Sequence, residues 1–187
     1  PSDNPLILHI ADMEQFYPLI KTDNAKIIAR AEALADVFWP GPLTMILPKA
    51  DNIPYETTGG LDTVAIRMPS HLVARALLQE CKMPIAAPSA NLSGRPSPTS
   101  ASHVIEDMNG RIEMIIDGGD VGIGVESTII DLTGEVPMLL RPGFVTPEML
   151  QQVLGTVETD AAVYRQVGKD VHPKACLLYT SDAADDL

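Results

Sequence analysis

Short runs of aliphatic and β-branched residues alternate with segments of helical periodicity along most of this chain of 187 residues. The clearest helical segment spans residues 24–38, where apolar residues recur at the spacing of one helix face. A Trp-Pro-Gly-Pro run at 39–42 ends it abruptly. Alternation of this kind is typical of α/β domains, in which amphipathic helices cover a sheet.

The same patterns place the other elements and predict a mixed sheet. A Thr-Gly-Glu turn at 133–135 joins two β-rich runs into a hairpin, which a purely parallel sheet does not contain. From Gly155 onward the apolar periodicity fades. We predict strands at 6–10, 44–47, 63–68, 85–87, 113–117, 126–132 and 136–141, and helices at 12–19, 24–38, 70–81, 101–108 and 146–154.

Composition limits the class of protein. Apolar residues make up 45% of the chain and charged residues 20%, which suits a globular domain with an aliphatic core, since aromatic residues are only 4%. No apolar run approaches the roughly 18–20 residues that span a bilayer. Two cysteines, Cys81 and Cys176, are too few for a disulfide framework. We therefore expect a cytoplasmic protein without a membrane anchor.

The net charge of −12 bears on possible partners. A protein that holds nucleic acid through bulk charge is basic, so strong direct binding of RNA is not expected here. Any phosphate that this chain binds must lie in a local pocket of arginine side chains and backbone N–H groups.

Polar residues interrupt the apolar pattern at four places. His9 and Arg67 lie within or at the end of β-rich runs, Ser127 and Arg141 flank the predicted hairpin, and a loop rich in Ser, Asn and Pro follows the strand at 85–87. Such a strand-end loop can hold the phosphates of a nucleotide. It can equally be an ordinary capped loop, and each arginine can be a strand-end side chain that reaches solvent. The residues alone therefore indicate an α/β domain with a polar cleft suited to an anion.

Several other kinds of site lack a sequence signal. The four histidines, His9, His71, His103 and His172, are scattered and do not form a metal-ligand pattern. There is no Walker loop, no dinucleotide-binding glycine motif after a strand and no nucleophile elbow. We predict no protein-held metal and no covalent nucleophile.

Six segments together resemble a known family. They read PSDNPLILHI, FWPGPLTMIL, DTVAIRMPSH, APSANLSGRPSPTS, VESTIID and LLRPG. In this order and spacing they resemble the YrdC-like L-threonylcarbamoyladenylate synthase family over about residues 1–154. The resemblance implies a twisted mixed sheet with flanking helices and a concave cleft. It also implies synthesis of L-threonylcarbamoyl-AMP from L-threonine, bicarbonate and ATP with release of pyrophosphate, for modification of adenosine 37 of tRNA by downstream transfer machinery.

The resemblance also implies roles for individual residues. Arg67 would bind the carboxylate of threonine, and Asn91 would support the loop that carries Ser89. No residue is assigned as a nucleophile, acid or base, and Mg²⁺ would accompany ATP. The residues expected to line the threonine and carbamate pocket are His9, Arg67, Ala87 and Ser127, and those expected at ATP are Asn4, Thr63, Ser89, Asn91, Ser97 and Arg141.

Both ends of the chain depart from the family pattern. A PTETVYGLG-like motif and a K-x-R pair, which precede the first strand in the family, do not occur before Pro1. We expect a piece of a longer two-domain protein, inactive by itself, in which 1–154 is the YrdC-like domain without its N-terminal part, 155–175 begins an interdomain linker and 176–187 is a non-native tail.

Two other functions remain open at this point. One is a relative that handles carbamoyl-adenylate for a different acceptor. The other is a non-catalytic module that binds double-stranded RNA, against which the acidic net charge argues.

Overall fold

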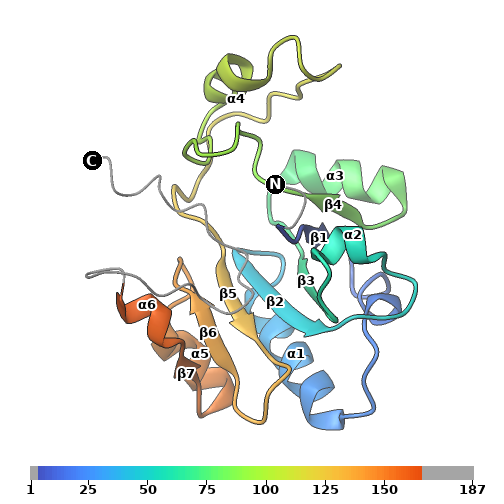
Figure 1. Ribbon diagram of the computed structural model, residues 1–187, viewed down its shortest axis with the longest axis vertical. Coiled ribbons are helices and arrows are strands. Elements are labelled where there is room, and N and C mark those ends of the chain that lie inside the picture. The colour runs from blue at the N-terminus through green and yellow to red at the C-terminus, as the bar shows by residue number, and fades with distance from the viewer. Residues whose placement is uncertain (1–3, 166–187) are drawn as a thin grey trace.

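A computed structural model describes residues 4–165. Seven strands form one twisted sheet in the order β4-β1-β3-β2-β5-β6-β7 (Figure 1). The strands are β1 (Ile7–His9), β2 (Leu43–Pro48), β3 (Thr63–Arg67), β4 (Ile85–Ala87), β5 (Thr128–Asp131), β6 (Met138–Arg141) and β7 (Glu158–Thr159).

The sheet is mixed, as predicted. Strand β1 runs parallel to β3, β2 to β5 and β6 to β7, whereas β1 and β4, β2 and β3, and β5 and β6 are antiparallel. The β5–β6 pair is the hairpin that the Thr-Gly-Glu turn indicated.

Helices flank the sheet, and their starts follow local capping chemistry. The side chain of Asn24 accepts a hydrogen bond from the Lys26 N–H at the start of the longest helix. Thr146 caps another helix through the Met149 N–H, with Pro147 at its first position. The helices are a 3₁₀ turn η1 (Tyr17–Leu19), α1 (Ala25–Phe38), α2 (Tyr55–Thr58), α3 (Leu72–Cys81), α4 (Ala101–Met108), α5 (Pro147–Leu154) and α6 (Ala161–Arg165).

The two faces of the sheet differ in what covers them. Alternate strand residues, including Met45, Ile66 and Ile130, form the main core with Leu34 of α1 and Leu150 of α5. On the opposite face the buried apolar cluster is small and centres on Ile46, Ala65 and Ile129. The strand residues His9, Thr63 and Arg67 lie on this second face, beside that small cluster.

Three sequence-based predictions of elements were wrong. Residues 113–117 form no strand, and Met114 is 74% exposed because that segment pairs with no described strand. Of the helix expected at 12–19, only η1 is helical, and Pro18 lies in its first turn, where the missing N–H of proline is tolerated, whereas deeper in a longer helix it would remove a hydrogen bond. Helix α3 begins at Leu72, two residues after the predicted start at residue 70.

The sheet also continues past the point where periodicity fades. Glu158 of β7 pairs with Met138 of β6, and Val157 is buried. Two residues of strand are too few to show a period in the sequence. The interpretation of 155–175 as the start of a linker stays a prediction, and the expected tail at 176–187 lies outside the described residues.

Candidate functional site

A row of polar side chains crosses five neighbouring strands on the less covered face of the sheet. His9 of β1 pairs with Arg67 of β3. Met45 pairs with Ile66, so Thr44 of β2 and Arg67 stand side by side at the next position. Beyond β2 the row continues to Arg141 of β6, which pairs with Ile129 of β5. The register thus gathers side chains that lie far apart in the sequence.

Burial and neighbouring charge set the ionisation of two members of this row. The pKa of His9 lies below its ordinary value, chiefly because the ring is removed from water and also because Arg67 is cationic. The His9 Nδ1 atom lies 3.1 Å from the Ile7 carbonyl oxygen, and hydrogen bonds to the backbone of Ile85 and Ile7 partly oppose the lowering of the pKa. Burial, and then the charge of Arg141, lower the pKa of Arg67, yet its guanidinium remains charged at neutral pH.

Ser127 lies buried between two partners. Its Oγ is 2.8 Å from Oγ1 of Thr44, which is itself fully buried. Arg141 donates from Nη2 to Ser127 Oγ at 3.0 Å and from Nε to the Ser127 carbonyl oxygen at 3.0 Å. The serine hydroxyl is thereby fixed in position directly before the first residue of β5.

Glu126 contacts both Ser97 and Arg141, two residues that the family resemblance assigned to ATP. Its Oε1 accepts a hydrogen bond from Ser97 Oγ at 2.8 Å, and its Oε2 is paired with Nη1 of Arg141. The loop that carries Ser97 is in this way joined to the end of the β5–β6 hairpin. The contact brings Ser97 and Arg141 to one carboxylate.

The segment after Arg141 passes very close to the start of β5. A Cβ atom on Gly143 would lie 2.6 Å from the Glu126 carbonyl oxygen and 2.7 Å from the Thr128 nitrogen, so no larger residue fits without a shift. Thr128 Oγ1 donates to the Val145 carbonyl oxygen and accepts from the Val145 N–H. These contacts hold the Arg-Pro-Gly turn against Ser127.

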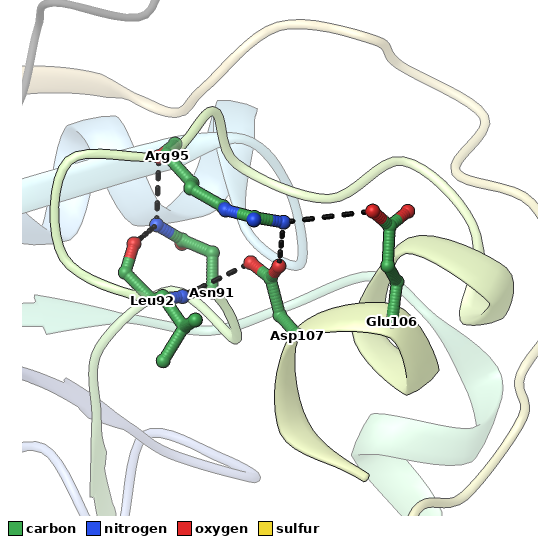
Figure 2. A network of polar contacts seen from close by, with 5 residues as sticks. All are labelled: Asn91, Leu92, Arg95, Glu106 and Asp107. Atoms are coloured by element: carbon green, nitrogen blue, oxygen red, sulfur yellow. Dashed lines mark hydrogen bonds and ion pairs between the residues drawn. The ribbon is translucent and has the colours of Figure 1, made fainter.

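The loop after β4 is ordered by its own polar contacts (Figure 2). Asn91 Nδ2 donates to the carbonyl oxygens of Leu92 and Arg95 at 2.9 and 2.8 Å. These two acceptors fix the orientation of the amide, whose Oδ1 is buried and finds no partner among the described residues. The supporting role expected for Asn91 is consistent with this arrangement. Ser89 precedes it and is exposed.

The remaining predicted residues lie away from the row. Ala87 pairs with Ile7, two positions from His9 along β1. Thr63 begins β3 while Arg67 ends it, so the two are roughly 13 Å apart along the strand, although they share a face. Asn4 is exposed before β1. The row therefore contains His9, Arg67, Ser127 and Arg141, and Ser97 joins it through Glu126, whereas Thr63 and Ala87 occupy other strand positions and Ser89, Asn91 and Asn4 lie outside the strands.

Sequence reasoning assigned no role to Thr44, Glu126 or Asp107. Thr44 occupies a strand that is otherwise apolar, which was a usable signal for a buried hydroxyl pair. Glu126 stands next to Ser127 in the printed sequence, and its contact with Ser97 depends on tertiary structure. Asp107 lies on helix α4 next to Glu106, and nothing in the sequence distinguishes this buried acid from an exposed one.

A cavity of about 320 Å³ adjoins the loop rather than the row. The residues that line it include Ala90, Thr99, Val104, Ile112, Ile116 and Val121. Within residues 4–165, no group of three or more His, Cys, Asp or Glu side chains could hold a metal ion. No helix in this described range is long and apolar enough to cross a membrane.

Known proteins share this sequence and fold. The threonylcarbamoyl-AMP synthase of Pyrococcus abyssi is 56% identical over 171 residues, which are 91% of this chain and 48% of that protein. The synthase of Bacillus subtilis is 51% identical over 174 residues, 92% of this chain and 49% of that protein. The chain thus spans about half the length of these curated relatives.

A solved structure agrees in fold. The crystal structure of P. abyssi Sua5 complexed with L-threonine matches with a TM-score of 0.85 and 54% identity, and covers 95% of this chain and 49% of that one. The sequence model of the Sua5, YciO and YrdC proteins, described as telomere recombination, matches residues 1–143. The chain therefore belongs to the Sua5/YciO/YrdC family, as its six sequence segments indicated.

Proposed function

We propose that the protein to which this chain belongs makes L-threonylcarbamoyl-AMP from L-threonine, bicarbonate and ATP, and releases pyrophosphate. The observation that carries the proposal is the row of His9, Arg67, Ser127 and Arg141 at one end of the sheet. It places two guanidinium groups and a buried hydroxyl on one face. The Pyrococcus abyssi and Bacillus subtilis synthases support it by their similarity over more than 90% of this chain.

Threonine would bind through its carboxylate at Arg67. The Nε atom of Arg67 already donates to the Gly41 carbonyl oxygen at 3.1 Å, which fixes the direction of the guanidinium plane. The two remaining nitrogens can then meet a carboxylate. His9 pairs with Arg67 across the strands and carries no charge at neutral pH, so it adds a polar surface without repelling the ammonium group of the amino acid.

ATP would bind on the side of Arg141, Ser97 and the loop that carries Ser89. Arg141 is held in place by Ser127 and is paired with Glu126, and its charge lowers the pKa of Arg67. Two like charges repel each other, and two bound anions relieve that repulsion. Arg67 and Arg141 therefore suit a site in which a carboxylate and a phosphate must lie close together.

The chemistry that this site would promote joins two anions. The amine of threonine attacks the carbon of bicarbonate, and loss of water leaves a carbamate. A carbamate oxygen then attacks the α-phosphorus of ATP, the bond to the β-phosphate oxygen breaks, and pyrophosphate leaves. Positioning and neutralisation of charge supply the catalysis in this proposal, and no side chain forms a covalent intermediate.

We also propose that Mg²⁺ arrives with ATP. Such an ion uses substrate phosphates, water and at most one or two carboxylates, so it needs no cage of protein ligands. When bound, the ion would neutralise charge on the phosphates.

The product would pass to the enzymes that modify adenosine 37 of tRNA, which places the activity in the cytoplasm in this proposal. The chain has no excess of cations over acids for direct contact with RNA, because its net charge is −12. Binding of double-stranded RNA is accordingly the less favoured function.

The product assay tests the proposal. The protein to which this chain belongs, called here the complete encoded chain, is incubated with ATP, L-threonine and ¹³C-bicarbonate. The adenylates that form are identified by mass. We expect an adenylate that carries both threonine and the labelled carbon. In a parallel incubation with ATP and carbamoyl phosphate but without threonine, formation of carbamoyl-adenylate would instead favour the carbamoyl-transferring relative.

A further inference from the structure

Helix α4 buries an acid instead of an apolar face. Asp107 is 7% exposed, and it is the one charged side chain that is buried among residues 4–164. It is also the one buried residue of this eight-residue helix, whose Ile105 is 48% exposed. A helix of this length is not stable alone, so contacts outside the helix must hold it. Figure 1 shows α4 apart from the sheet.

Those contacts run from Asp107 to the loop after β4. Its Oδ2 accepts a hydrogen bond from the Leu92 N–H at 3.0 Å, and its Oδ1 accepts one from Nη1 of Arg95 at 2.5 Å (Figure 2). Arg95 also lies 3.6 Å from Oε1 of Glu106, an exposed pair that contributes little. A carboxylate is buried at low cost only when both oxygens are satisfied in this way.

Contacts within the loop connect the Asp107 hydrogen bonds to the segment that carries Ser89 and Ser97, the residues expected at ATP. Asn91 donates to the carbonyl oxygens of Leu92 and Arg95, and the Arg95 N–H donates to the Leu92 carbonyl oxygen at 3.0 Å. Residues 91–95 therefore form one closed turn. The turn lies between Ser89 and Ser97 in the chain, so its position sets the direction from which both serines approach a ligand.

We propose that Asp107 is a positioning residue for the nucleotide, which it does not touch, and that it acts by pinning the 91–95 turn to α4. This inference rests on the proposed function, because it takes Ser89 and Ser97 as ligands of ATP. Threonine binding is independent of Asp107, since Arg67, His9 and Ser127 are held by the sheet and by Arg141.

The variant D107N tests this in the complete encoded chain. The amide keeps the size of the side chain and one acceptor oxygen, and it loses the charge that Arg95 requires. We expect the dissociation constant of a non-hydrolysable ATP analogue to rise about tenfold while that of L-threonine changes less than about twofold. The control is D131N, because Asp131 is a half-buried acid that, like Asp107, accepts a backbone N–H, in this case from Thr133 at 2.8 Å.

A double-mutant cycle and a spare variant make the result decisive. If R95Q and D107N act through the same ion pair, their losses of affinity for the ATP analogue do not add. The double variant then has the same dissociation constant as the single variant with the lower affinity. R95Q alone carries the test should D107N fail to fold, because Arg95 is 52% exposed. Hydrogen exchange of residues 91–95 should be faster in both variants.

Two results would overturn the inference. One is a D107N variant that binds the ATP analogue as tightly as the wild type does. The other is an equal loss of threonine and nucleotide affinity, which a general loss of structure produces. A wild-type chain that fails to bind the analogue at all contradicts the proposed function itself, and so the two failures are distinguishable.

Discussion

Arg141 holds Ser127 by two hydrogen bonds, one from Nε to the serine carbonyl oxygen and one from Nη2 to the serine Oγ, both 3.0 Å long. The geometry uses the planar fork of a guanidinium, and a lysine cannot reproduce it. Arg141 therefore has two tasks in this account. It fixes the buried hydroxyl of Ser127 directly before β5, and it supplies a positive charge that acts on Arg67.

R141K separates these tasks, because it keeps the charge and loses the fork. We expect the complete encoded chain to bind an ATP analogue about tenfold to a hundredfold more weakly, which corresponds to about 1.5–3 kcal/mol. Isothermal titration measures the change. The matched control is R30K, since Arg30 of α1 also donates two hydrogen bonds, to the carbonyl oxygens of Gly134 and Glu135, and α1 packs on the opposite face of the sheet. Equal affinities in wild type and R141K would refute the role given to Arg141.

R67A removes the cation assigned to the threonine carboxylate. A bidentate charge-assisted contact contributes about 1.5–3 kcal/mol, so threonine affinity should fall roughly tenfold to a hundredfold. Titration of the variant with L-threonine and, separately, with the ATP analogue measures both affinities. Unchanged affinity for threonine together with a large loss for the analogue would show that Arg67 serves the nucleotide instead.

T44V tests the buried hydroxyl pair. The substitution leaves the shape of residue 44 nearly unchanged and removes the partner that lies 2.8 Å from Ser127 Oγ. A buried polar group deprived of a partner costs about 1–3 kcal/mol, so the free energy of unfolding in urea should fall by that amount. T44S retains the hydroxyl and should recover most of the loss. If T44S is as unstable as T44V, the lost packing of the methyl group explains the effect and the hydrogen bond does not.

His9 predicts a pH dependence of stability. Its pKa in the folded chain lies below the ordinary value of 6.5, mainly through burial and then through Arg67. As the pH falls below 6.5, the unfolded chain takes up a proton that the folded chain does not, so unfolding becomes more favourable. The stability that neutral His9 contributes is present above 6.5 and is lost as the pH falls toward the folded pKa.

Urea unfolding of wild type and H9Q from about pH 7.5 to about pH 5.5 measures this effect. The loss of stability over that range should be smaller in H9Q. H103Q, which replaces an exposed histidine on α4, is the control. Identical pH profiles for wild type and H9Q would contradict the burial argument.

Much of the fold was predictable from the sequence because its elements carry strong local signals. The helix α1 has a full apolar face, an Asn cap and a Trp-Pro-Gly-Pro stop, and the β5–β6 hairpin has a clear turn. The strand expected at 113–117 looked equally apolar, yet Met114 and Ile116 are exposed. Local propensity does not reveal whether a strand has a partner.

Part of the row of polar residues could be singled out from the sequence, but the contacts that join its members could not. Arg67, Ser127 and Arg141 were notable because each interrupts or ends an apolar run. The links through Thr44, Glu126 and Asp107 depend on strand register and on the path of a loop, which no local pattern encodes. Six short segments in a fixed order indicated the family, because the order carries information that each segment lacks.

Release of pyrophosphate tests the central claim most directly. The complete encoded chain is assayed with ATP and Mg²⁺, with L-threonine and bicarbonate added singly and together. This account predicts that pyrophosphate forms only when both are present, because the carbamate is the nucleophile that displaces it. Pyrophosphate release at the same rate without threonine would contradict the account.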